Sequence, residues 1–388
     1  MAELEATSGA GGAPAAPRHH QRPLTPATPD GRCAVPVAII SDPGEDLDDE
    51  MATLLLRCLV DEGTLDPRCV VCNLAPAAAR ARLMRGTLDM LGLEDVPVGV
   101  GSAGGSASHR DTFSHLAAGY IAGADAPVED GQALLARVFG AARDGSLTLL
   151  CISALTDARE FLARNEDLFL RKIREVVIMG GVVPSAAGLV PDTAANNAFD
   201  EAASAALYAA LQDLRVPMVV VTREAAYACP VPRRVYDDIA ATGSPIGVRL
   251  QAAQRTSITA LWRRTHASGA ERLGLPARCG PAWFLDTFCG GAGSGRGAQD
   301  EVWDLVRSFN MYDAVALIAA SPRLRREHFD PTVVAVGGVD HAVIGLSRDA
   351  SGVRDVDGLR AFLTDGFLRG IRSPLCSPKP RPRKPTAS

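Results

Sequence analysis

Acidic side chains crowd the stretch DPGEDLDDE, residues 42–50, and could hold a metal ion. Carboxylates packed into one turn repel one another, so the folded turn requires either solvent around most of them or a cation among them. Clusters of oxygen ligands suit Ca²⁺ or Mg²⁺. The structural alternative is that acids favour the positive N-terminal end of a helix, with Asp46 as its cap. The acids are Asp42, Glu45, Asp46, Asp48, Asp49 and Glu50.

A strand and a helix must hold this acidic turn at its two ends. Residues 37–40 form an apolar, β-branched run, which is typical of a strand buried on both faces. From Asp48 the apolar residues recur with helical spacing, and Gly63 stands where a helix would end. The carboxyl end of a buried parallel strand is where open α/β sheets bind ligands. The turn is therefore a candidate ligand site.

Strand-like and helix-like segments alternate along the rest of the chain. This alternation predicts an α/β fold with a mainly parallel, doubly wound open sheet and helices on both faces. Further strands are predicted at residues 69–74, 96–101, 147–153, 175–181, 216–222 and 332–338, and helices at 78–92, 200–212 and from Thr156 onward.

The composition indicates a soluble globular chain and excludes some partners. The chain has 388 residues, of which 47% are hydrophobic, and a formal net charge of −5 with scattered basic residues, so we expect no nucleic-acid partner. No apolar stretch approaches the roughly 20 residues of a membrane helix, so we expect no membrane association and a cytoplasmic location. Nine cysteines lie mostly in apolar runs, which predicts reduced core thiols, including the pair Cys69 and Cys72.

One folded domain is expected between two tails. Residues 1–34 are rich in Ala, Pro, Gly and Thr, and residues 373–388 are basic and Pro-rich, so both tails are predicted to be disordered. Residues 35–372 form the domain, with a helical insertion at about 245–308. The part of it at 261–289 carries two of the three tryptophans, and it either lines a base pocket or is purely structural.

Three later stretches also place polar side chains at the ends of predicted strands. Each has a structural explanation: an Asn can close a turn or cap a helix, and an Asp can favour a first helical turn. These residues are Asn73, the pair Asn196 and Asn197, and the pair Tyr312 and Asp313.

Together, these stretches resemble the nucleoside hydrolase family, ribohydrolases that cleave the N-glycosidic bonds of nucleosides. Members carry a D-x-D-P-G-x-D-D turn, an Asn after the second strand, a G-P-L-T-N-I-A segment, an M-G-G strand end with an Asn-bearing loop, and a late H-D-P-x-A-V helix start. The matching pieces here are SDPGEDLDDEMA, VVCNL, CISALTDA, VVIMGG with TAANNAFDEAA, and MYDAVALIAA. The resemblance covers residues 35 to about 345 and implies an α/β fold with a catalytic Ca²⁺.

The resemblance also implies a set of metal ligands and a reaction. Asp42, Asp49 and Asp313 would bind Ca²⁺ through their carboxylates, and the Ile152 carbonyl would add a ligand. Asp42 would act as general base toward a metal-bound water in hydrolysis of a ribonucleoside to free base and ribose. The negative cluster would stabilise the oxocarbenium-like transition state more than the neutral substrate.

Substrate contacts follow from the same resemblance. Asp48 and Asn73 would hold the ribose 2′- and 3′-hydroxyls. Asn196 or Asn197 would lie near the 5′ end, where Asp192 could substitute for a family Glu whose place is taken by Ala194. Family members form dimers or tetramers, so a homodimer or homotetramer is expected by analogy.

The chain departs from the family pattern at the acidic turn and at the proton donor. Two extra residues widen the turn, so Glu45 or Asp46 could take the place of Asp48. Tyr312 replaces the His that can protonate the departing base, and Ile40 replaces the first Asp. These departures keep open an alternative: a weak or inactive homologue that binds a nucleoside or ribose-like ligand.

Overall fold

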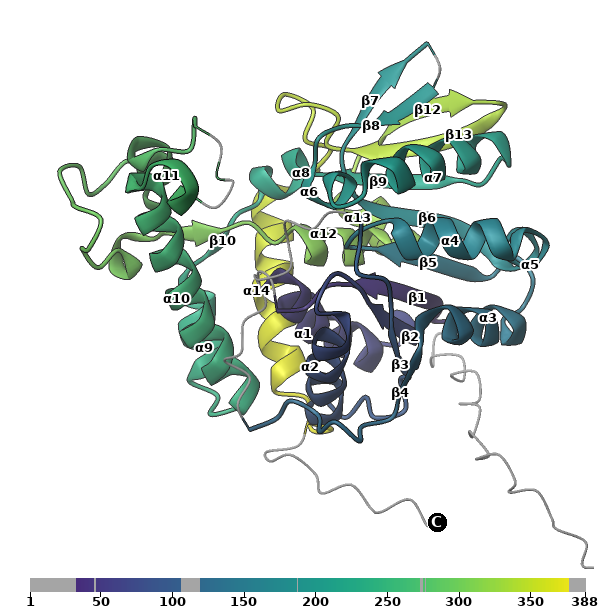
Figure 1. Cartoon of the computed structure of the whole chain (residues 1–388), viewed down its shortest axis with the longest axis horizontal. Helices are drawn as coiled ribbons and strands as arrows, with labels where there is room; N and C mark the ends of the chain where they lie inside the picture. The colour runs from purple at the N-terminus through teal and green to yellow at the C-terminus, as the bar shows by residue number, and fades with distance from the viewer. Residues whose placement is uncertain are drawn as a thin grey trace, which may run out of the picture.

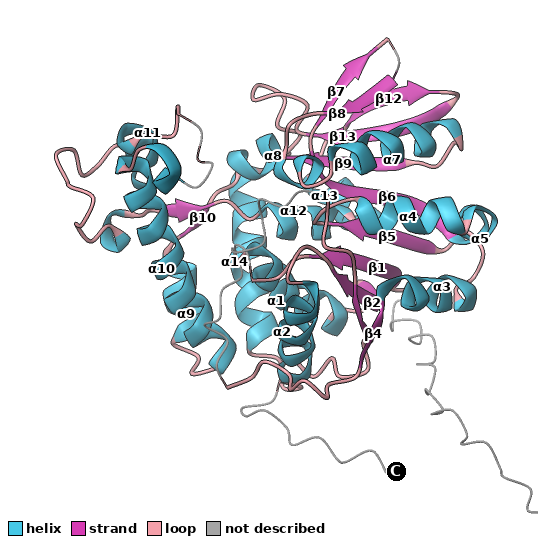
Figure 2. Cartoon of the chain, in the orientation of Figure 1, coloured by secondary structure: helices cyan, strands magenta, loops and turns pink. Residues whose placement is uncertain are grey.

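The architecture is a nine-stranded sheet covered by helices on both faces, as seen in this computed structural model (Figures 1 and 2). The structure describes residues 33–44, 47–105, 119–186, 188–272, 275 and 277–376. The strand order is β12-β13-β9-β6-β5-β1-β2-β3-β4. Neighbouring strands are parallel except for the β12–β13 pair. The predicted α/β fold with a mainly parallel sheet is therefore confirmed.

The strands and helices have the following bounds. The sheet contains β1 (Val35–Ser41), β2 (Leu65–Cys72), β3 (Val98–Val100), β4 (Val128–Asp130), β5 (Leu147–Cys151), β6 (Ile173–Gly180), β9 (Met218–Thr222), β12 (Thr332–Val336) and β13 (Val339–Ile344). Two small antiparallel pairs are β7 (Val182–Ser185) with β8 (Gly188–Pro191), and β10 (Val231–Pro232) with β11 (Ser308–Phe309). The helices are α1 (Asp48–Asp61), α2 (Ala77–Met90), α3 (Gly131–Ala141), α4 (Thr156–Arg164), α5 (Glu166–Lys172), α6 (Ala195–Ala198), α7 (Glu201–Asp213), α8 (Arg223–Ala228), α9 (Arg234–Ala240), α10 (Pro245–His266), α11 (Pro281–Cys289), α12 (Tyr312–Ala319), α13 (Pro322–His328) and α14 (Val356–Ile371), with short 3₁₀ turns at Gly269–Arg272 and Trp303–Leu305.

The core lies on both faces of the sheet because the central strands bury alternate side chains on opposite sides. Along β1, Val37 and Ile39 pack on the face covered by α1, α2, α12 and α14. Ala38 and Ile40 pack on the other face, with α3, α4, α5 and α7. The apolar run at residues 37–40 is thus a strand buried on both faces, as predicted.

The sheet edge formed by β12 differs from the central strands. Residues 332–338 were expected to behave like the other apolar strands, but β12 pairs antiparallel with β13 and leaves Val333 61% exposed. An edge strand has a neighbour on one side only, and a run of β-branched residues favours a strand without fixing its place in the sheet. The antiparallel pairing of β12 at the edge of the sheet therefore could not be predicted from its residues alone.

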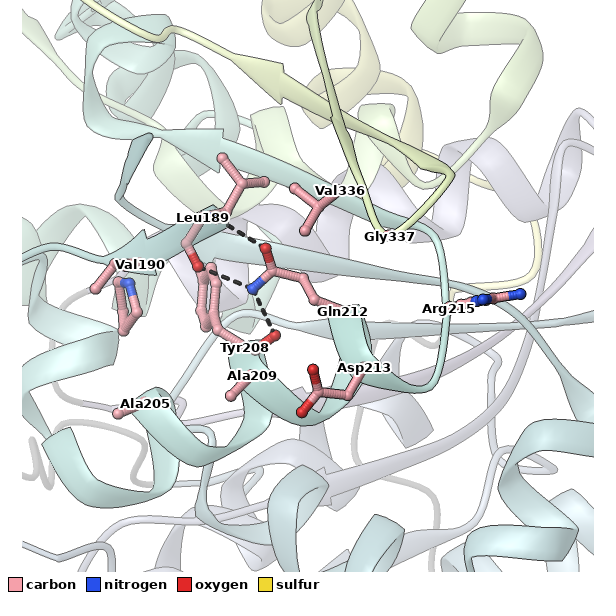
Figure 3. Close-up of a pocket in the computed structure, with 11 residues that line it drawn as sticks. Leu189, Val190, Ala205, Tyr208, Ala209, Gln212, Asp213, Arg215, Val336 and Gly337 are labelled. Atoms are coloured by element: carbon pink, nitrogen blue, oxygen red, sulfur yellow. Dashed lines mark hydrogen bonds between the residues drawn. The ribbon is translucent and has the colours of Figure 1, made fainter. Parts of the chain in front are cut away.

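Two regions lie outside the nine-stranded sheet. The segment expected as a helical insertion contains α10 and α11, which lie to one side of the sheet, at the left of Figure 1. The hairpin β7–β8 is attached to α7 by Gln212, whose side chain bonds both the N–H and the C=O of Leu189 (Figure 3). The predicted tails at 1–34 and 373–388 lie largely outside the described residues.

The cysteine pair of β2 is part of the core. Cys69 and Cys72 are fully buried free thiols, and burial raises the pKa of Cys69 to about 12. The prediction that these cysteines are core residues is confirmed. Among the described helices, none combines the length and the apolar character needed to span a bilayer.

Candidate metal centre and its surroundings

The acidic turn joins the carboxyl end of β1 to the start of α1. Gly44 adopts a positive φ of 96°, which an L side chain rarely adopts, so the chain reverses there. Arg80 of α2, fully buried, donates hydrogen bonds to the carbonyl oxygens of Asp42 at 2.8 Å and Pro43 at 3.2 Å. A buried guanidinium thus holds the backbone of the turn at these two residues. Glu45 and Asp46, which were candidates for the site, lie outside the described residues.

Three carboxylates from two helix starts converge beside this turn. One oxygen from each of Asp48, Asp49 and Asp313 lies within 4.8 Å of the others, and all three residues are less than a tenth exposed. Mutual repulsion of buried carboxylates is strong, and a divalent cation among them would relieve it. The ligand set is all oxygen, which fits a hard cation such as Ca²⁺ or Mg²⁺. The residues present therefore could hold a metal ion.

Hydrogen bonds fix the direction in which two of these carboxylates point. The Oδ1 atom of Asp49 accepts from the Ser41 hydroxyl at 2.5 Å and from the Asp42 backbone N–H at 3.0 Å. The Oδ2 atom of Asp48 accepts from the backbone N–H groups of Tyr312 and Asp313 at 3.1 and 3.3 Å. The end of β1 therefore orients Asp49, and the start of α12 orients Asp48.

The converging set differs by one residue from the predicted ligands Asp42, Asp49 and Asp313. Asp48, which was expected at the ribose hydroxyls, lies in the set, while Asp42 adjoins it through its backbone bond to Asp49. Ile152, the predicted carbonyl ligand, follows β5 and lines a small cavity together with Asp49. Both Asp42 and Ile152 are therefore next to the cluster.

Asn73 stands at the centre of a buried polar network. Its amide nitrogen donates to the Ala154 carbonyl and to Asp157 Oδ2, both at 2.9 Å, and its oxygen accepts from the Ser153 hydroxyl at 2.5 Å. Asp157 also accepts from the backbone N–H and hydroxyl of Ser102, at 2.9 and 2.7 Å. The network ties the carboxyl ends of β2, β3 and β5 together, and it takes up the polar atoms of Asn73.

Asn197 and Asp192 organise the loop between β8 and α7. The buried amide nitrogen of Asn197 donates to the carbonyl oxygens of Gly181 and Asp192 at 2.8 and 3.2 Å. The Asp192 carboxylate accepts from the Ala194 N–H at 2.7 Å and pairs with Arg223 at 3.2 Å. Sequence reasoning missed Arg223 because it belongs to no motif.

The interpretation that Asn196 or Asn197 caps α7 is wrong. The cap is Asp200, whose side chain accepts from the Ala203 N–H at 3.0 Å. Asn196 instead donates to the Met179 carbonyl at 2.9 Å, at the end of β6. Both asparagines therefore hold the strand end rather than a helix end.

Tyr312 lies beside the carboxylate cluster with a second tyrosine against it. Its hydroxyl accepts from the Asn310 amide at 3.4 Å, and its ring meets the exposed Tyr227 ring edge-on at 6.0 Å. Burial, and then the nearby Tyr227, raises the pKa of Tyr312 well above its ordinary value. The phenol therefore stays protonated at neutral pH and is a weak acid. Tyr227 gave no sequence signal.

The fold and the site together define a class: α/β proteins with a buried carboxylate cluster at the carboxyl edge of a parallel sheet. The family model described as inosine-uridine preferring nucleoside hydrolase matches residues 37–341, and the chain belongs to this family. The resemblance inferred from the sequence is confirmed. No match was found among the curated proteins.

Solved structures agree with this assignment. The effector protein XOO4466 is 30% identical with a TM-score of 0.77, over 87% of this chain and 94% of that one. The type III effector protein XopQ, complexed with adenosine diphosphate ribose, is also 30% identical with a TM-score of 0.77, over 87% of this chain and 95% of that one. The plant nucleoside hydrolase PpNRh1 is 15% identical with a TM-score of 0.55, over 88% and 99%, and shows the fold alone.

Proposed function

We propose that this protein binds a ribose-containing ligand of the ADP-ribose type at a Ca²⁺ ion held by Asp48, Asp49 and Asp313. The observation that carries the proposal is the buried convergence of these three carboxylates. The 30% identity to a protein complexed with adenosine diphosphate ribose supports the ligand class. A nucleoside shares the ribose and would compete for the same site.

The other residues around the cluster have roles consistent with this proposal. Asp42 and Ile152 adjoin the cluster, and the Asp42 carboxylate and the Ile152 carbonyl would complete the cation site. A bound Ca²⁺ would supply coordination for a ribose diol and lower the pKa of a bound water. Asn73 would position the strand ends beneath the ribose, because its own polar atoms are engaged within the protein.

The 5′ side of the ligand would lie toward the loop between β8 and α7. Asp192, Asn196 and Asn197 hold this loop against the carboxyl end of β6. Arg223 offers a cation there that is 39% exposed on its side chain. Ligands that extend beyond the 5′ carbon would therefore contact this loop.

The second candidate function is hydrolysis of the N-glycosidic bond of a ribonucleoside, with Asp42 as general base and Tyr312 as donor to the departing base. Family membership and the negative cluster favour it, since carboxylates stabilise an oxocarbenium-like transition state. The raised pKa of Tyr312 disfavours it, because a phenol protonates a leaving base less readily than an imidazolium does. Turnover would therefore be slow, and binding is the better supported function.

Calorimetric titration tests the first candidate. We expect wild-type protein to bind ADP-ribose in the presence of Ca²⁺ and to lose this binding with a chelator. Asp49→Asn and Asp313→Asn should each weaken Ca²⁺ binding by more than the roughly 10–100-fold typical of losing a supporting partner. Asp213→Asn, at an exposed acid on α7, is the matched control and should bind like the wild type. Equal Ca²⁺ binding by all variants would contradict the proposal.

A reducing-sugar assay separates binding from hydrolysis. We expect wild-type protein with Ca²⁺ to release little or no ribose from a panel of ribonucleosides at concentrations where binding is saturated. Rapid release that is abolished in Asp42→Ala would favour the hydrolase over the binding protein.

A further inference from the structure

One fully buried ion pair joins the helix that carries the acidic turn to the segment outside the sheet. The Arg249 guanidinium of α10 donates a hydrogen bond to the Glu50 carboxylate of α1, across 199 residues of sequence. The side chains of Glu50 and Arg249 are 0% and 3% exposed. This contact ties the first turn of α1 to the first two turns of α10.

The buried Tyr120 lies beside this pair, and several polar atoms there lack a hydrogen-bond partner of good geometry. Glu50 Oε2, Arg249 Nε and Nη2, and the buried Tyr120 hydroxyl have no hydrogen-bond partner among the described residues. Burying charges with incomplete hydrogen bonding is unfavourable, and a pair of apolar side chains of similar volume often gives equal or greater stability. The pair is therefore poorly explained by stability alone.

The place of Glu50 in the chain suggests what the pair does. Glu50 directly follows Asp48 and Asp49 in the first turn of α1, and residues in one turn move together. Leu47, at the N-cap position of this helix, makes no side-chain capping bond, so the turn is held by bonds from other segments, among them the end of β1 and the start of α12. The Glu50–Arg249 contact supplies a restraint from another helix.

We infer that Arg249 is a positioning residue for the cation site: through Glu50, it fixes the first turn of α1 so that Asp48 and Asp49 meet Asp313. The inference rests on the proposed function, because it assumes that these carboxylates bind a cation. It assigns to α10, which lies beside the sheet, a part in cation affinity.

The experiment compares Ca²⁺ affinity with stability in the full chain. In the double variant Glu50→Leu with Arg249→Leu, both charges are removed, and we expect a melting temperature in the absence of Ca²⁺ close to that of the wild type. We expect its Ca²⁺ affinity, measured by calorimetry, to fall about 10–100-fold. A merely structural pair would leave the affinity unchanged once the stability is restored, and that result would overturn the inference.

Two further variants keep the test decisive. Arg249→Lys keeps the charge but not the planar guanidinium, so it should retain the fold and lose part of the Ca²⁺ affinity, and wild-type affinity in this variant would also overturn the inference. The control is Arg57→Met with Asp61→Asn, which removes an ion pair at the far end of α1 and should leave Ca²⁺ affinity unchanged. Absence of Ca²⁺ binding by the wild type would instead refute the proposed cation site itself.

Discussion

Asp48 caps a helix that begins 264 residues later in the chain, because its Oδ2 atom accepts the backbone N–H of Tyr312 at 3.1 Å. The same atom accepts the N–H of Asp313 at 3.3 Å. Met311, at the N-cap position of α12, makes no side-chain capping bond of its own. The first residue of α1 therefore does for α12 what a local Ser or Asp usually does.

Two substitutions of Asp48 should separate the effect of this cap on stability from the effect of the carboxylate charge. Asp48→Ala removes both, and Asp48→Asn removes the charge but keeps an oxygen that can accept the N–H groups. We expect Asp48→Ala to be less stable than Asp48→Asn by about 1 kcal/mol, the usual value of an N-cap. Urea unfolding without Ca²⁺ measures the difference, and equal stability of the two variants would refute the capping role.

Gly370 allows α14 to lie directly against the backbone of α1. A Cβ at this position would lie 1.8 Å from the Leu54 carbonyl oxygen, whereas one at Gly366 would meet the movable end of the Leu55 side chain at 2.5 Å. Gly370→Ala should therefore destabilise the protein by about 3 kcal/mol or more, since backbone has to move. Gly366→Ala is the matched control with a smaller loss, and denaturant unfolding of both checks the order.

Substitutions of two neighbouring side chains of α7 should change the free energy of unfolding in opposite directions. The buried Tyr208 hydroxyl has no hydrogen-bond partner among the described residues, so Tyr208→Phe should stabilise the protein by about 1 kcal/mol. Gln212 bonds the backbone of Leu189 at 2.8 and 3.0 Å (Figure 3), so Gln212→Leu should destabilise it by about 2 kcal/mol. Thermal unfolding would contradict this account if both substitutions destabilised equally.

His341 should make the protein sensitive to acid. It is fully buried, its Nδ1 accepts the Met218 N–H at 3.2 Å, and burial lowers its pKa below the ordinary value of 6.5. The unfolded chain therefore binds a proton more readily than the folded one. Stability should be at its full value above pH 6.5 and fall as the pH decreases below it, by up to about 1.4 kcal/mol per pH unit.

The variant His341→Leu isolates this histidine from the other titrating groups. We expect its unfolding free energy to change less between pH 7.5 and pH 5 than that of the wild type. His328→Asn is the comparison, because His328 also has a lowered pKa but is only partly buried. An unchanged pH dependence in His341→Leu would show that other groups are responsible.

Local sequence pattern was enough to predict most of the central strands and helices. The apolar run before Asp42 and the helical spacing after Asp48 are patterns of residues close in sequence, so they predict β1 and α1 directly. The antiparallel edge β12 was missed because its residues look like those of a central strand. Pairing direction depends on distant segments, and a single strand carries no sign of it.

The site was predictable only in part, because local motifs indicate some of its residues whereas contacts between distant elements leave no local pattern. The motif resemblance predicts both Asp49 and Asp313 as metal ligands, and the structure brings their carboxylates together. Asp48 was given another role because the widened turn shifts it relative to the family motif, whereas its bond to Tyr312 depends on tertiary packing. The Glu50–Arg249 contact and the approach of Tyr227 to Tyr312 likewise join separate elements without leaving a local pattern.

The separation of the two helix starts also bears on synthesis by the ribosome. Strands β1 and β2 are close in sequence and can pair early, whereas α1 packs against α12 and α14, which are made late. Asp313 is made only after some four-fifths of the chain, so the nascent N-terminal half carries its acids without their third member. Truncated translation products that stop before α12 would therefore contain no complete carboxylate cluster.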